Sequence, residues 1–205
     1  MSKFHASLCA ICVSAAPLIA PTPAAAAGPA TERILTLVVL DDGAGAREDD
    51  VAAAQSIVVR VFAQIGARVV WLTRQEFGAA MPAAPAAARA YCRSVIFVHL
   101  ATAARNPTEL GKALTDSNVV WAYVPLIEDA ATYADVAVSD FLGYVIAHEI
   151  GHLLLGARAH AASGIMASRI DADAVRRRSL EFLPDQARSM QKRLAAWASR
   201  DAAGR

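Results

Sequence analysis

The sequence predicts an α+β fold whose first half is organised like an α/β protein. Strand, helix and strand patterns alternate between residues 33 and 72, which indicates two parallel strands joined by a crossover. A long apolar helix and a C-terminal helix occupy the second half, and no internal repeat is visible. We therefore expect one domain built on a twisted mixed sheet of about four strands, one of them at an edge.

The first crossover is the clearest part of the pattern. Residues 33–40 (RILTLVVL) are nearly all apolar, which is typical of a strand inside a sheet. Between residues 48 and 65 the apolar positions recur at helical spacing, and Gly66 ends the helix. Residues 68–72 form the second strand, parallel to the first.

The remaining strands are less regular. Residues 94–100 form the third strand, and its lone His99 is expected to be a hydrogen-bonded, partly buried side chain. The stretches 76–90 and 105–118 have no clear period and are predicted to be loops.

Residues 119–126 (VVWAYVPL) form the fourth strand candidate. Pro125 has no N–H group to contribute to a ladder, so it favours a position at the edge of the sheet.

An H-E-x-x-H motif lies in the long apolar helix of the second half. Ser139 is a good N-cap residue, and the helix runs without proline as far as Gly156. Within it, His148 and His152 are four residues apart and therefore project from one face. Two imidazoles at this spacing can share one zinc ion, and Glu149 lies beside them as a base for a metal-activated water.

The segment after the motif is polar before it becomes helical again. The charge run that includes residues 176–178 (RRR) is predicted to be a solvated surface. Residues 184–199 form a last helix, whose apolar stripe should lie across the core.

The composition argues against two classes of partner. The 205 residues carry a formal net charge of +1, which gives no electrostatic case for nucleic acid or an anionic membrane. Residues 1–27 are similar to a secretory signal, with a weakly basic start, an apolar run and the small residues Ala25, Ala26 and Ala27 before Gly28. The run is too short and proline-broken to span a membrane stably, so we expect a secreted or periplasmic domain at 28–205. Of the three cysteines only Cys92 would remain, so no intramolecular disulfide is expected.

A catalytic zinc site needs a third protein ligand. His160 is favoured because it follows the helix-ending Gly156 by four residues, so the chain can turn and bring its side chain back to the metal. Glu181, Asp171 and Asp173 are the alternatives.

The stretch HEIGHLLLGARAHAASGIM, residues 148–166, resembles the zinc-binding region of the metzincin clan of metallopeptidases. That clan has H-E-x-x-H-x-x-G-x-x-H followed by a methionine-containing turn, the Met-turn. Here Gly156 is one residue late and His160 two residues late, and Arg158 stands where the strict pattern has its third histidine. The turn would be SGIM, ending at Met166. The resemblance therefore points to a divergent, small bacterial-type family with longer spacing.

The resemblance implies a metzincin-like fold, with an edge strand, an active-site helix, a Met-turn and a C-terminal helix. It also implies one catalytic zinc ion and hydrolysis of peptide bonds in peptide or protein substrates, with Glu149 as general base. The clan pairs an extended substrate with its edge strand, which here implies the backbone of Ala122, Tyr123 and Val124. Ser168 stands where some members have a tyrosine near the metal.

Two alternatives remain open at this point. One is an exported protein that binds zinc without hydrolysis, although a purely structural site has no need for Glu149 and usually has four protein ligands. The other is a thermolysin-type peptidase with Glu181 as the third ligand.

Overall fold

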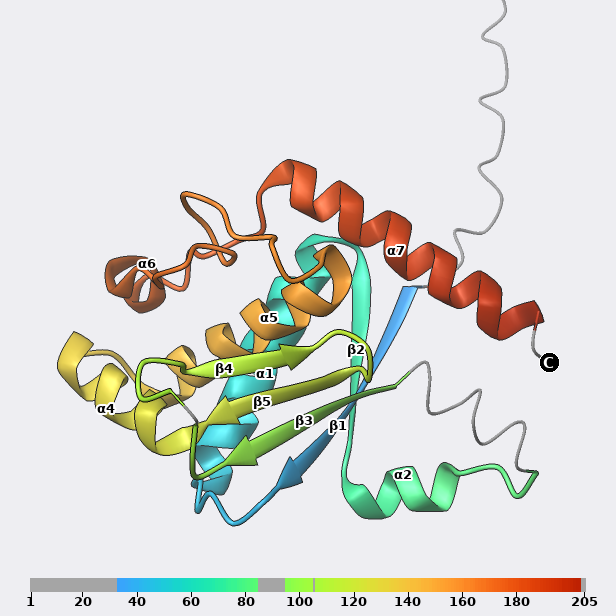
Figure 1. Ribbon diagram of the computed structural model, residues 1–205, viewed down its shortest axis with the longest axis horizontal. Coiled ribbons are helices and arrows are strands. Elements are labelled where there is room, and N and C mark those ends of the chain that lie inside the picture. The colour runs from blue at the N-terminus through green and yellow to red at the C-terminus, as the bar shows by residue number, and fades with distance from the viewer. Residues whose placement is uncertain (1–32, 85–94, 105, 204–205) are drawn as a thin grey trace, which may run out of the picture. The chain divides into compact units, whose positions relative to one another are not determined.

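The computed structural model in Figure 1 describes residues 33–84, 95–104 and 106–203, with side chains as far as residue 197. The predictions for residues 1–27 and for Cys92 lie outside the described residues. The strands are β1 (Arg33–Asp41), β2 (Ala67–Leu72), β3 (Val95–Ala101), β4 (Gly111–Leu114) and β5 (Val119–Tyr123). The helices are α1 (Glu48–Gln64), α2 (Arg74–Ala80), α4 (Val124–Ala134), α5 (Val138–Leu155), α6 (Ala172–Arg176) and α7 (Pro184–Ala203).

The five strands form one mixed sheet in the order β2-β1-β3-β5-β4. β1 pairs in parallel with β2 and β3, and β3 with β5, whereas β4 runs antiparallel to β5. The strand–helix–strand crossover from β1 through α1 to β2 is as predicted. The α+β class and the mixed sheet are therefore confirmed, with one strand more than expected.

The edge of the sheet lies in a different place from the prediction. β5 pairs with β3 on one side and with β4 on the other, so it is an interior strand. Ala122 and Tyr123 are buried in it, and Val124 begins helix α4. Pro125 lies in the first turn of that helix, where its missing N–H has no intrahelical partner to lose. The expectation that these three residues form a substrate-pairing edge was therefore wrong.

The edge strand on this side of the sheet is β4, inside the stretch predicted to be a loop. Its four residues, GKAL, are too few to show a period of two, and only one of them is a large apolar residue. β4 exists because it can pair with β5 after a short turn, in which Asn118 adopts a left-handed φ of 53°.

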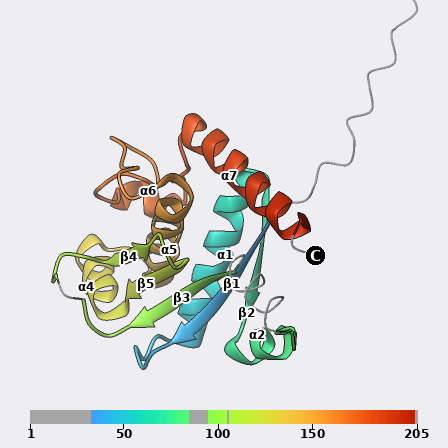
Figure 2. The same ribbon diagram turned by 45° about the vertical axis from the view of Figure 1, so that its right-hand side comes forward.

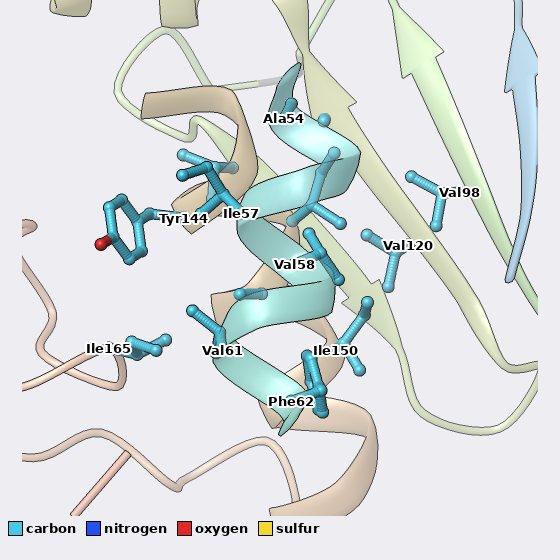
Figure 3. Close-up of a cluster of buried hydrophobic side chains, with 14 of the residues drawn as sticks. Ala54, Ile57, Val58, Val61, Phe62, Val98, Val120, Tyr144, Ile150 and Ile165 are labelled. Atoms are coloured by element: carbon cyan, nitrogen blue, oxygen red, sulfur yellow. The ribbon is translucent and has the colours of Figure 1, made fainter. Parts of the chain in front are cut away.

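Helices α1 and α5 pack together against one face of the sheet (Figures 1 and 2), and Figure 3 shows part of this apolar cluster. The side chains of Val58, Val61 and Phe62 on α1 are fully buried in it. α5 crosses α1 closely at Gly143, where a Cβ atom would lie 2.7 Å from the Cβ atom of Ile57. Because α5 is buried along nearly its whole length, any polar group on it is forced to find a partner inside the protein.

The arginine run after α5 does more than face solvent. Arg176 donates hydrogen bonds to the carbonyl oxygens of Ala134 and Asp135, and Arg178 Nε donates to the buried Asp140 carboxylate at 2.8 Å. The run therefore attaches the segment around α6 to the ends of α4 and α5. None of the described helices is both long and apolar enough to cross a membrane.

Candidate metal centre

Three histidine side chains converge at the C-terminal half of α5. His148 and His152 lie one turn apart on the helix, each 8% exposed, and their Nε2 atoms are 3.1 Å apart. His160, which is exposed, comes from the loop after the helix and places its Nε2 3.1 Å from that of His152. The predicted convergence of these three residues is confirmed, and together they could hold a metal ion.

The loop returns to the helix because Gly156 reverses the chain. Gly156 has a φ of 101°, a value that favours glycine, and its carbonyl oxygen then accepts a hydrogen bond from the N–H of Ala159. Further on, the N–H of Ala161 donates to the carbonyl oxygen of Met166, which closes the segment into a compact turn. His160 is therefore held between two short-range hydrogen bonds that fix the path of the loop.

The hydrogen bonds of the two helical histidines fix their tautomers. Nδ1 of His148 lies 2.7 Å from the carbonyl oxygen of Ile165, and Nδ1 of His152 lies 3.2 Å from that of Gly156. A carbonyl oxygen only accepts, so each Nδ1 carries the hydrogen and each neutral ring turns an Nε2 lone pair towards the other. Two facing lone pairs repel unless a cation lies between them. Their 3.1 Å separation is close to the roughly 3.3 Å between two ligands in a tetrahedral zinc site.

Burial keeps these imidazoles neutral. Removal from water lowers the pKa of His148 to about 4, against a smaller opposite effect of its hydrogen bond to Ile165. Burial also lowers the pKa of His152. Neutral imidazoles are the form that binds a metal ion, so the site is ready to do so at neutral pH.

Met166 packs directly against the motif helix. Its side chain is fully buried, and a Cβ atom on Gly151 would lie only 2.3 Å from its sulfur. The glycine within the H-E-I-G-H sequence therefore leaves the space that the Met166 side chain occupies. The predicted turn ending at Met166 lies next to the histidines, and its residue Ile165 holds the ring of His148.

Glu149 also belongs to α5, and its side chain lies between this helix and the edge strand β4. Its side chain is 8% exposed and contacts Gly111, where a Cβ atom would be 2.7 Å from the Cγ atom of Glu149. Burial raises the pKa of Glu149 to about 8, the negative charge of Glu109 adds to the rise, and the backbone N–H of Ala113 opposes it. A bound cation beside the carboxylate would lower this pKa again.

The histidines and Glu149 line one cavity of about 710 Å³. It is lined by residues 108–113, which are the approach to β4 and its first residues, and by the segment 167–170 after the turn. Phe141 and Val145 of α5 extend the cavity along the helix. The cavity is large enough for part of an extended chain, and its chemistry is concentrated at the histidine end.

The alternative third ligands have other partners. Glu181 accepts a hydrogen bond from Gln64 at 3.2 Å, Asp171 caps α6 by accepting from the N–H of Ala174, and Asp173 pairs with Arg176. Within the part of the chain that the structure describes, the three histidines are the one group of three metal-ligating side chains close enough to share an ion.

His99 is the ordinary side chain that the sequence predicts. Its Nδ1 lies 2.5 Å from a carboxylate oxygen of Asp42, and its ring stacks on Trp121 with centroids 4.4 Å apart. It does not line the cavity.

Sequence reasoning missed the contribution of the edge strand, namely Glu109, Gly111 and Ala113. Ala122, Tyr123 and Val124, predicted for that role, do not line the cavity. The strand has no sequence signal of its own, so only its pairing with β5 could have revealed it.

Comparison of this chain with protein-family models and with curated proteins gives no match.

Proposed function

We propose that this protein is a zinc-dependent endopeptidase that hydrolyses peptide bonds, with His148, His152 and His160 as ligands and Glu149 as general base. One observation carries the proposal: three imidazole nitrogens converge in a cavity that also contains a buried glutamate carboxylate. A purely structural zinc site is usually closed by four protein ligands, and the described residues supply three.

Zinc bound here would lower the pKa of a water molecule and polarise the scissile carbonyl group. The hydrogen bonds from Nδ1 of His148 and His152 to backbone carbonyls keep the Nε2 lone pairs directed at one point. Phe141 and Val145 give the α5 side of the cavity an apolar surface beside the histidines.

Glu149 is the one buried carboxylate on the α5 wall of the cavity; it follows His148 in the sequence and lines the same cavity as the three histidines. Its role would be to take a proton from the attacking water and to pass it to the leaving amine. A carboxylate whose pKa is shifted towards neutrality can do both at neutral pH.

The edge strand β4 suits an extended peptide. The N–H of Tyr123 donates to the carbonyl oxygen of Leu110, so Leu110 and Tyr123 form a hydrogen-bonded pair. Alternation along the antiparallel ladder then leaves the backbone groups of Gly111 and Ala113 pointing away from β5. A substrate strand could pair with the backbone groups of Gly111 and with the carbonyl oxygen of Ala113, whose N–H already donates to Glu149, and could run across the cavity beside Glu149.

The resemblance to the metzincins supports the same proposal. The mixed sheet with an antiparallel edge strand, the histidine-bearing helix and the methionine turn follow the order that the resemblance implies. The longer spacing to His160 is compatible with a shared ion, because that histidine still comes within 3.1 Å of His152. As an extension of the proposal, the signal-like residues 1–27 would direct the enzyme to the periplasm or out of the cell.

The test is metal content and peptidase activity of the purified protein, wild type beside Glu149→Ala. We expect one zinc per chain in both proteins and hydrolysis of a mixed peptide library by the wild type alone. Zinc in both without hydrolysis in either would favour a metal-binding protein without this activity. Absence of zinc from both proteins would contradict the assignment of the three histidines as zinc ligands, and with it the proposal.

A further inference from the structure

The contact between Glu149 and the edge strand has an unusual geometry. An ideal Cβ atom at position 111 would lie 2.7 Å from Cγ of Glu149 and 3.0 Å from its Oε1. On another side it would lie 3.0 Å from the carbonyl oxygen of Trp121, which belongs to the neighbouring strand β5. A side chain at this position is therefore enclosed, and it could be accommodated only if Glu149 or the strand moved.

The backbone conformation of Gly111 does not itself require glycine. Among the described residues, five glycines have a left-handed φ, and Gly111 is not one of them. What this position requires is the absence of a side chain, because the Glu149 carboxylate occupies the space. Ala113, whose backbone N–H acts on the same carboxylate, faces the same way as Gly111 along the strand and is also small.

We propose that Gly111 is a positioning residue: its bare Cα forms the surface of β4 against which the Glu149 side chain lies, and so holds the carboxylate in the cavity that the three histidines line. The inference rests on the proposed function, because the carboxylate is there to transfer protons. The strand that would pair with a peptide would then also set the place of the general base relative to that peptide.

The competing explanation is that Gly111 only lets α5 pack closely under the sheet. Both explanations predict that Gly111→Ala lowers stability. They predict different kinetics for the variant, because a misplaced general base lowers kcat without weakening the binding of metal or peptide. They also differ in what happens when the Glu149 side chain is removed.

The kinetic arm compares wild type, Gly111→Ala and Gly78→Ala, each loaded with zinc. Gly78 is a suitable control because a Cβ atom there meets nothing within 4 Å. We expect Gly111→Ala to lower kcat by about 10- to 100-fold, the loss typical of a catalytic group displaced by about 1 Å, with KM and one zinc per chain unchanged. Retention of wild-type kcat by a folded, zinc-loaded Gly111→Ala protein would overturn the proposal.

The stability arm needs no activity. Urea unfolding of the zinc-free proteins is measured for Gly111→Ala in the wild type and in a Glu149→Ala background, which lacks the Cγ atom that the new methyl group would meet. We expect a marked loss of stability in the first background and a clearly smaller one in the second, or folding in the second alone. Equal losses, or failure to fold in both, would mean that Gly111 is required for another reason. If the wild-type protein binds zinc but hydrolyses nothing, the proposed function fails while this arm still decides whether Gly111 and Glu149 are coupled.

Discussion

The ring of His148 is held by a carbonyl group of the turn that follows it in the chain: its Nδ1 lies 2.7 Å from the oxygen of Ile165, seventeen residues later. This one hydrogen bond ties helix α5 to the turn that ends at Met166. It also sets the tautomer of His148, since a carbonyl oxygen can only accept. The geometry of the candidate metal centre therefore depends on the turn as much as on the helix.

The first prediction concerns Gly164, which precedes Ile165. It has a φ of 77°, and a Cβ atom would lie 2.6 Å from the carbonyl oxygen of Glu181. Gly164→Ala should therefore displace the turn and weaken the hold on His148, lowering zinc affinity by about 10- to 100-fold, as for other residues that support a metal ligand. Zinc dissociation constants from competition with a chelator would measure the effect.

Gly45→Ala is the matched control for this variant. Gly45 also has a left-handed φ, of 68°, but a Cβ atom there meets nothing within 4 Å. It should cost about 1 to 2 kcal/mol of stability from backbone strain alone and leave zinc affinity unchanged. An equal loss of affinity in both variants would contradict a specific role for the turn.

The second prediction concerns the packing of Met166 on the motif helix. In Gly151→Ala the new methyl group would lie 2.3 Å from the sulfur of Met166, so the buried Met166 side chain, or the turn that carries it, must shift. We expect a loss of about 1 to 3 kcal/mol in the free energy of unfolding, as for other overpacked cores. Chemical denaturation of the zinc-free protein measures this free energy. Unchanged stability would show that Met166 can shift without cost and that its packing on Gly151 does not contribute to stability.

The third prediction separates the two assignments of the third ligand. His160→Ala should greatly weaken zinc binding, because it removes a nitrogen that lies 3.1 Å from that of His152. Glu181→Ala should leave zinc binding intact, because it removes only a hydrogen bond to Gln64. Zinc content after dialysis decides between them, and the reverse result would favour a thermolysin-type site.

The fourth prediction is a pH dependence of the zinc-free protein. Burial, reinforced by Glu109, raises the pKa of Glu149 to about 8 from 4.5, so the folded protein retains a proton that the unfolded chain releases. The contribution of Glu149 to stability is thus complete below pH 4.5 and is lost as the pH rises through 8.

Glu149→Gln, which cannot ionise, should therefore gain stability over the wild type as the pH rises. Between pH 6.5 and 8 the gain should be about 2 kcal/mol. His148, whose pKa is lowered in the folded state, is present in both proteins, so its own contribution cancels in the comparison. Urea unfolding in the presence of a chelator would measure the difference. Parallel stability curves for the two proteins would show that the carboxylate is ionised in the folded state.

The local sequence pattern was sufficient to predict those structural features that depend only on residues near one another in the chain. The four-residue spacing of His148 and His152 places them one turn apart on any helix, and the apolar run around them could only be a buried helix. The β1–α1–β2 crossover was predictable for the same reason, since its elements are long enough to show their periods.

One local signal was misleading and another was incomplete, because pairing and packing decided the outcome. Proline is disfavoured in a central strand, which made Pro125 look like a residue of an edge strand. It is equally compatible with the first turn of a helix, which is where Pro125 lies. The run 176–178 is charged and exposed, yet Arg178 reaches the buried Asp140, whose position is set by helix α5.

The sequence by itself determined the helix that carries His148, Glu149 and His152, because periodicity and ligand spacing are short-range properties. The tertiary structure alone decided that β4 is the edge strand next to β5 and that Gly111 faces Glu149. It also decided between His160, which the sequence favoured, and the alternatives Glu181, Asp171 and Asp173. Such contacts join segments far apart in the chain, and what selects them is the burial and hydrogen bonding of the whole domain rather than the preference of any one segment.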